Sequence, residues 1–176
     1  MRHGLMTLLA LSLATTAAAQ ERAEHEKTEE GEASKATPAL AAALKEAKVS
    51  LTSGLKAAEQ EGRPISGKFE VEDGKLQLSV YTMKGDKFSE VIVDHKSGKV
   101  AKSKPISGGD DLAAAQKQAQ AMGKSKSSLR DVTAKAEKAN PGYHAVSVVP
   151  EIEDGKAQAD VTLLKGTTSK SVDEPL

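Results

Sequence analysis

Histidine is the residue type in this chain best suited to acid–base or metal chemistry, because the sequence contains four histidines and no cysteine. His95 follows Asp94, and a carboxylate beside an imidazole can orient it as a general base. No two histidines have the spacing of a paired metal-binding motif. His95 is also expected at the end of a strand, where a solvated histidine is the commoner outcome. We therefore predict no histidine-based catalytic or metal site.

Two acidic segments, residues 70–73 and 151–154, raise the question of calcium binding. Ca²⁺ requires several oxygen ligands that converge on one centre. In a hairpin, alternating glutamates instead fan outward on one solvated face, and each segment is followed, after one glycine, by a lysine. No serine lies in a Gly-x-Ser-x-Gly motif. The inventory predicts a protein that is not an enzyme and that has no cofactor and no bound metal.

The acidic segments belong to a unit that the sequence contains twice. Residues 70–85 read EVEDGKLQLSVYTMKG and residues 151–166 read EIEDGKAQADVTLLKG, with nine of sixteen residues identical. In each copy an Asp-Gly pair separates two segments with alternating apolar residues, which predicts a β-hairpin. Upstream, residues 50–62 align with 128–140 and have apolar residues at helical spacing. Each unit therefore predicts a helix followed by strands.

These elements predict an α+β fold of two repeats, each a helix packed on a small antiparallel β-sheet of about three strands. Leu76, Leu78 and Val80 form the row that the helix is expected to cover, and residues 88–94 form the third strand. The second copy looks eroded, since residues 167–176 keep only Val172 as an obvious strand residue. Alanine-rich helices at residues 38–48 and 110–122 link the repeats and should lie close against a neighbouring surface.

The order of these features resembles the PepSY domain. A Ser-Leu helix start, an Ala-Glu helix end, a strand, an Asp-Gly-Lys hairpin and a further strand occur in that order. Asp94, Gly98, Lys99 and Val100 are similar to the family's closing Asp-x-x-x-Gly-Lys-Val turn. The resemblance covers residues 48–104 well and 127–176 only in part. It implies no catalysis, and either inhibition of a peptidase or another regulatory role outside the cytoplasm.

The first 19 residues have the pattern of a secretory signal peptide. Arg2 and His3 precede an uncharged stretch, residues 4–19, which is shorter than the roughly 20 apolar residues of a spanning helix. Small residues end that stretch at Ala19 and allow cleavage before Gln20. We predict an exported protein, periplasmic or secreted, with no stable membrane insertion after cleavage of the signal.

Composition divides the remaining chain into a linker and two repeats. Residues 20–37 hold six glutamates against three basic residues, with alanine as the only apolar side chain, which predicts a disordered acidic linker. Repeat 1 is expected over residues 38–107, with its core at 48–104. Repeat 2 is expected over 108–176, with its core at 127–176, and residues 102–109 predict the connection.

Charge and size bound what the repeats can do. The formal net charge is zero and only four residues are aromatic, so neither the charge nor the stacking surface for nucleic acid binding is present. A unit of about 60 to 70 residues buries only roughly 60% of its unfolded surface and is marginal by itself. We therefore expect the two copies to share an interface. The sequence does not indicate an oligomeric state.

Two functions from different classes remain open. The first is a non-catalytic exported binding or regulatory module that masks or inhibits a peptidase or another envelope protein, by pairing of a sheet edge with the partner. The second is an envelope sensor module that binds a small ligand or a metal. The predicted partner-binding surface consists of Tyr81, Met83, Ile92, Asp94 and Gly98. Its apolar members are also candidates for coverage by the other repeat or by an alanine-rich helix.

Overall fold

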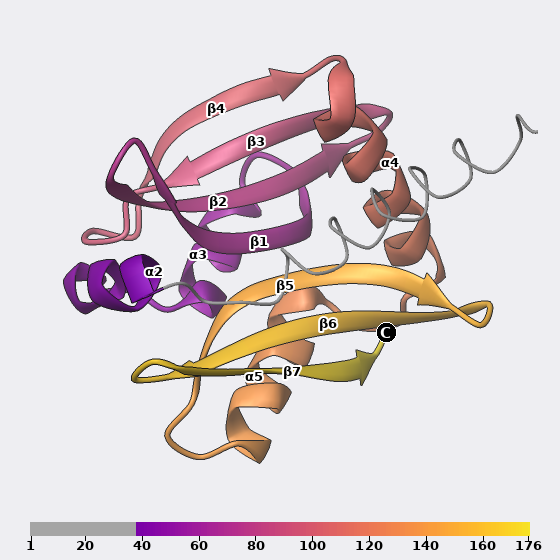
Figure 1. Ribbon diagram of the computed structural model, residues 1–176. Coiled ribbons are helices and arrows are strands. Elements are labelled where there is room, and N and C mark those ends of the chain that lie inside the picture. The colour runs from indigo at the N-terminus through magenta and orange to yellow at the C-terminus, as the bar shows by residue number, and fades with distance from the viewer. Residues whose placement is uncertain (1–37) are drawn as a thin grey trace, which may run out of the picture. The chain divides into compact units, whose positions relative to one another are not determined.

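The two copies of the repeated unit build one seven-stranded antiparallel sheet in the part of the chain that the structure describes, residues 38–176 (Figure 1). In this computed structural model the strand order is β4-β3-β2-β1-β5-β6-β7. The expected α+β class is confirmed, whereas the expected separate sheets of about three strands are wrong. The predicted signal peptide and acidic linker lie in residues 1–37, outside the described residues.

The first copy contains a helix and four strands. Helix α3 spans Leu51–Ala58, and the strands are β1 (Arg63–Glu72), β2 (Lys75–Lys84), β3 (Lys87–Val93) and β4 (Val100–Ile106). Strand β4 pairs with β3 over most of the segment expected to be a connection. Strand β4 is difficult to predict because this edge strand is exposed along its middle and has no alternating apolar residues.

The second copy contains a helix and three strands. Helix α5 spans Leu129–Ala139, and the strands are β5 (His144–Glu153), β6 (Lys156–Lys165) and β7 (Thr168–Pro175). Strand β7 pairs with β6 from Thr168 to Pro175, so the last strand is less eroded than its composition predicted. Its inner-face side chains include Lys170 and Glu174, which is why the apolar pattern was hard to recognise.

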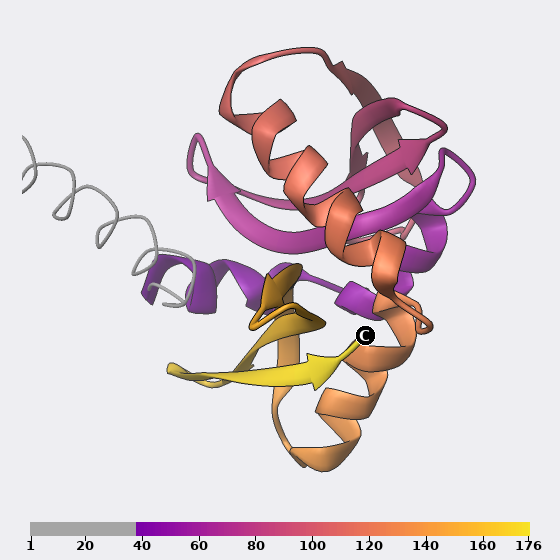
Figure 2. The same cartoon turned by 90° about the vertical axis from the view of Figure 1, so that its right-hand side faces the viewer.

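Three further helical segments precede the two repeat helices. They are α2 (Pro38–Ala43) and the 3-10 turn η1 (Leu44–Glu46) before α3, and α4 (Gly109–Lys124) before α5. Figure 2 shows α3 and α5 on one side of the sheet and α2 on the other side. We call the side covered by α3 and α5 the inner face and the opposite side the outer face. No helix among the described residues has the length and apolar character needed to cross a membrane.

The copies meet at strands β1 and β5 through a local two-fold relation. Gly67 pairs with Val148, and these residues are the same position of the two copies, 81 residues apart. Equivalent bulges interrupt both hairpins, between Pro64 and Ser66 and between Ala145 and Ser147. The sheet is therefore continuous because the repeated unit pairs with itself in antiparallel fashion across Gly67 and Val148.

Both predicted hairpins are confirmed, and their turns have the same geometry. Asp73 and Gly74 have φ of 49° and 73°, and Asp154 and Gly155 have φ of 48° and 76°. Positive φ at both central residues defines the type I′ turn that Asp-Gly favours, because glycine and aspartate tolerate the left-handed region better than most residues. These turns fix the register that places Leu78 and Ala159 on the inner face.

One apolar core lies between the inner face and the two helices. Leu51 and Leu55 of α3 and Leu129 of α5 belong to the same buried cluster as Val80 and Val161 of the sheet. Ser50 and Ser128 cap the two helices, each accepting a hydrogen bond from a backbone amide of the first turn. The shared sheet and core confirm that the two copies have a common interface.

Candidate functional site

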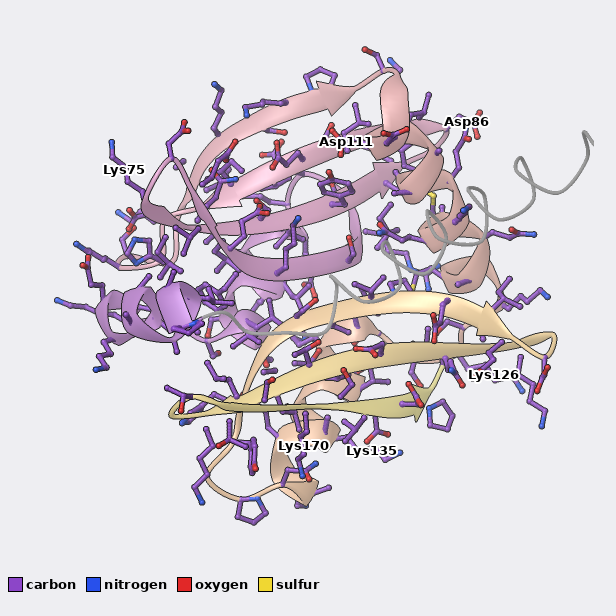
Figure 3. The ribbon with its side chains drawn as sticks, viewed as in Figure 1. Lys75, Asp86, Asp111, Lys126, Lys135 and Lys170 are labelled. Atoms are coloured by element: carbon purple, nitrogen blue, oxygen red, sulfur yellow. The ribbon has the colours of Figure 1, made fainter. Side chains whose placement is uncertain are left out.

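The apolar residues of the predicted partner-binding surface, Tyr81, Met83 and Ile92, lie on the outer face and are half-buried. Tyr81 Oη donates a hydrogen bond to Asp111 Oδ1 at 2.7 Å, so the first turn of α4 reaches this face (Figure 3). Burial and this hydrogen bond raise the pKa of the Tyr81 phenol well above its usual range. Among the described residues the exposed large apolar side chain is Val71. The outer face therefore offers no broad apolar patch to a partner.

Asp94 and Gly98, the other members of that surface, form the turn between β3 and β4. The Asp94 carboxylate accepts hydrogen bonds from the amides of Lys96 at 3.2 Å and Ser97 at 2.6 Å. Hydrogen bonding from Ser97 lowers the pKa of this carboxyl. Gly98 has a φ of 73° and donates its amide to the Asp94 carbonyl at 2.8 Å. Both residues therefore have a structural role in forming this turn.

A pocket of about 660 Å³ lies where the segment before α3 meets the second copy. Helix α2, the turn η1 and residues 47–50 form one wall. The other walls come from Phe69 of β1, the end of α5, the start of β5, and the end of β6 with its following turn. This volume is within the range of small-molecule sites, about 300 to 1,000 Å³. The apolar lining residues include Ala41, Leu44, Val49, Phe69, Val146 and Leu164.

Four charged or titratable side chains line this pocket, together with the hydroxyl residues Ser50 and Thr167. Glu137 at the end of α5 accepts a hydrogen bond from the Ala145 amide at 2.8 Å, and this bond fixes the carboxylate against the start of β5. Lys45, Lys48 and His144 also line the pocket and are exposed to solvent. An apolar interior with cationic groups at solvent-facing positions suits a molecule with an apolar body and a polar end.

A second, smaller pocket of about 250 Å³ occupies the equivalent place in the other half of the fold. Helical residues of the two copies are 78 positions apart, so Glu59 and Met122 correspond to Glu137 and Leu44 of the larger pocket. Strand residues are 81 positions apart, so Arg63 corresponds to His144. Arg130 Nη1 lies 3.2 Å from Glu59 Oε1, whereas the position corresponding to Arg130 in the first copy is Thr52. The duplication therefore made two pockets, and larger side chains narrow one of them.

The turn at Asp94 to Gly98 supports the wall of the larger pocket. The His95 carbonyl accepts hydrogen bonds from the amides of Lys48 at 2.8 Å and Val49 at 3.3 Å. A Cβ atom added at Gly98 would lie 3.2 Å from Val49 Cγ1, so the turn is packed closely against the same segment. The motif that the sequence singled out is therefore part of the scaffold that positions two pocket-lining residues.

Other candidates for catalysis or metal binding were examined by their geometry. Ser53 and Lys56 have the Ser-x-x-Lys spacing of a nucleophile motif, which the sequence analysis overlooked. Both are exposed on α3, and Ser53 Oγ lies 3.0 Å from Ser50 Oγ in the helix cap. Within residues 38–176, no group of three or more acidic or histidine side chains has an arrangement that could hold a metal ion. His25 lies outside the described residues.

Both edges of the sheet carry features that discourage pairing with another strand. Strand β4 contains Pro105 and two exposed lysines, Lys102 and Lys104. Strand β7 places Glu174 on the inner face, where it is largely buried and its Oε2 lies 2.6 Å from Lys135 Nζ. Lysine and proline on an edge strand, and charges that point inward, are devices by which natural sheets avoid edge-to-edge association. This weakens the edge-pairing route that the sequence suggested.

The residues of the larger pocket do not stand out as a site in the sequence. The alanine-rich composition of residues 38–48 predicts the helix that forms one wall and its close approach to a neighbouring surface. The structure places Ala41 of α2 against Val146 and Leu164 of the second copy. No local pattern links these residues, because the pocket exists only once both copies share one sheet.

A comparison of the chain with models of protein families, with curated proteins and with solved structures finds no match.

Proposed function

We propose that this protein is a non-catalytic binding module that acts outside the cytoplasm and holds a small ligand in the pocket between η1 and the second copy. The observation that carries the proposal is the size and lining of this pocket, about 660 Å³ with a mostly apolar interior. The predicted signal peptide supports the location, since small residues precede the expected cleavage site at Gln20.

The contrast between the two related pockets also supports a binding role. Apolar side chains that line a solvent-open hollow lack the contacts that close packing gives them in a protein interior. In the smaller pocket the lining side chains include Arg63, Met122 and Arg130, and the two arginines are larger than their counterparts in the other copy. The larger pocket has Leu44, His144 and no arginine at the equivalent positions, so its space stays open to solvent. A ligand site explains why this space is not filled by side chains.

The role implied by the resemblance to PepSY domains, masking or inhibition of a peptidase, remains a prediction. Its expected route was pairing with a sheet edge, and the lysines, the proline and the inward Glu174 on the two edges argue against that route. An apolar side chain from a partner could instead enter the pocket. The small ligand is the better supported occupant because the pocket volume of about 660 Å³ is within the range of small-molecule sites.

The proposal is tested with an uncharged apolar fluorophore, N-phenyl-1-naphthylamine, titrated with the mature protein. We expect saturable binding with enhanced fluorescence. Ala42 is exposed and lines the pocket, so Ala42→Trp should fill the site and weaken binding at least tenfold while the protein still folds. The matched control is Gln120→Trp, at the exposed equivalent position of α4. Equal binding by the wild type and Ala42→Trp, or no saturable binding at all, would contradict the proposal.

A further inference from the structure

The charges that line the larger pocket differ in whether the protein itself neutralises them. Glu137 receives the Ala145 amide at 2.8 Å. Lys45 and Lys48 are exposed, and neither takes part in an ion pair within residues 38–176. The acidic residue between them, Glu46, faces Lys96 with a Nζ–Oε2 distance of 3.5 Å. Among the described residues, the pocket therefore presents two ammonium groups without an ion-pair partner and one carboxylate that is already hydrogen-bonded.

We propose that the ligand of this pocket is an amphiphile with an anionic head group, and that Lys45 and Lys48 hold its charge while its apolar body lies between α2 and the second copy. This inference rests on the proposed function. A lysine side chain keeps its ammonium group in water while its methylene stem covers apolar surface. Two such residues on the wall formed by η1 and residues 47–50 can meet a head group at the mouth of an apolar cavity.

In the smaller pocket, the protein itself neutralises the corresponding acidic side chain. There, the acidic residue at the helix end, Glu59, has its own cation in Arg130 at 3.2 Å. The residue equivalent to Arg130 in the first copy is Thr52, which is not among the residues that line the larger pocket and offers no charge to Glu137. The cations of the larger pocket come instead from Lys45 and Lys48, outside the repeat helix. The internal anion does not engage them, so they are available to a bound molecule.

The other charged side chains near the pocket, within residues 38–176, are compatible with this arrangement. His144 lines the pocket, is exposed, and carries no negative charge. Lys165 lies just before the lining residue Gly166 and places its Nζ 5.8 Å from the centre of the Tyr143 ring. Among the described residues that line the pocket, Glu137 is the one acidic side chain. The balance at this end of the molecule therefore favours an anion.

The effect of each lysine is expected to be modest and sensitive to salt. Exposed ion pairs contribute little free energy individually, so removal of one lysine should weaken the binding of an anionic ligand about two- to fivefold. Removal of both should weaken it roughly tenfold, and the difference should shrink as salt shortens the screening length. The apolar body supplies the remaining affinity, which the lysine variants should leave unchanged.

The test is displacement of the bound fluorophore by three ligands with the same ten-carbon chain, all below their micelle concentrations: decanoate, decanol and decylammonium. We expect decanoate to bind best, by about tenfold over decylammonium, with decanol between them. The variant Lys45→Gln/Lys48→Gln should lose this preference and keep its decanol affinity. Lys126→Gln is the matched control, since Lys126 is the counterpart of Lys48 and lies at the other end of the sheet from α2 (Figure 3).

Each outcome bears on the inference, and its failure is distinguishable from failure of the proposed function. If all three ligands displace the fluorophore equally, or if the double lysine variant binds decanoate as the wild type does, the anionic head group is refuted while the pocket remains a ligand site. If the fluorophore itself does not bind, both the ligand site and the anionic head group of its ligand are refuted. A preference for decanoate that Lys126→Gln removes as strongly would place the anion elsewhere and overturn the assignment.

Discussion

The contact between α3 and β2 makes a quantitative prediction about how the two copies fill the same space. A Cβ atom added at Gly54 would lie 2.5 Å from Leu78 Cδ2, so the glycine leaves room for the leucine. The corresponding residues of the second copy are Val132 and Ala159, both buried in the same core. In the first copy the larger residue of this helix–sheet contact is on the strand, and in the second copy it is on the helix.

The experiment gives the first copy the residues of the second copy at this contact, by Gly54→Val and Leu78→Ala. Leu78 is fully buried, so Leu78→Ala should cost about 2 to 5 kcal/mol through lost burial and a cavity. Gly54→Val alone should cost about 1 to 3 kcal/mol, because the added methyl groups meet the leucine. In the double variant the valine fills the cavity, and the helix gains from the loss of glycine. We expect the double variant to be more stable than Leu78→Ala by about 1 to 3 kcal/mol.

Urea denaturation of the wild type, both single variants and the double variant measures these free energies and their coupling. Gln77→Ala is the control for strand phase, since Gln77 lies on the outer face and its loss should cost about 1 kcal/mol or less. Additive effects of Gly54→Val and Leu78→Ala would refute the packing described here. Equal effects of Gln77→Ala and Leu78→Ala would mean that the faces of β2 are reversed.

Three further predictions concern the interface, one carboxyl group and processing. A fragment of residues 38–107 should melt below the full chain, because β1 becomes an edge strand and α3 loses its contact with Leu129; matching melting temperatures would count against the shared core. Burial raises the pKa of Asp160, with Asp173 adding to the shift, so the folded state holds this proton more tightly than the unfolded state and stability falls as the pH rises above about 4. Asp160→Asn should therefore raise the urea midpoint at pH 7 and lose that advantage below about pH 3; the same gain at both values would contradict the assignment. Export should leave a mature chain that begins at Gln20, and an intact mass that retains residues 1–19 would refute the predicted localisation.

Local patterns in the sequence were sufficient for the hairpins and the repeat helices. The Asp-Gly pairs at 73–74 and 154–155 predict turns because their backbone requirement involves only two residues. Ser50 and Ser128 predict helix starts for a similar reason, since a cap satisfies amides one turn away. These features depend on neighbours in sequence, and the structure has them where they were expected.

The joining of the two sheets and the pocket depend on contacts between distant residues. Gly67 pairs with Val148, and neither residue has a side chain that would specify this partner. The equal position of the two residues within their repeats is a feature of the sequence that is consistent with this pairing. The pocket was missed because Ala41 and Leu164 meet only through this pairing of the copies. Strand β7 lacks apolar alternation because its inner-face residues include the charged Lys170 and Glu174.

The most direct test of the central claim is to map where decanoate binds by the amide chemical shifts of the ¹⁵N-labelled mature protein. If the larger pocket is the ligand site, saturable shift changes should be concentrated at Ala47, Ala145 and Thr167, which line it from three different segments. The equivalent pocket supplies the internal control, so Met122 and Arg130 should shift little. Changes centred on Met122 and Arg130, or changes that do not saturate and are spread over the outer face, would contradict the assignment of the ligand site.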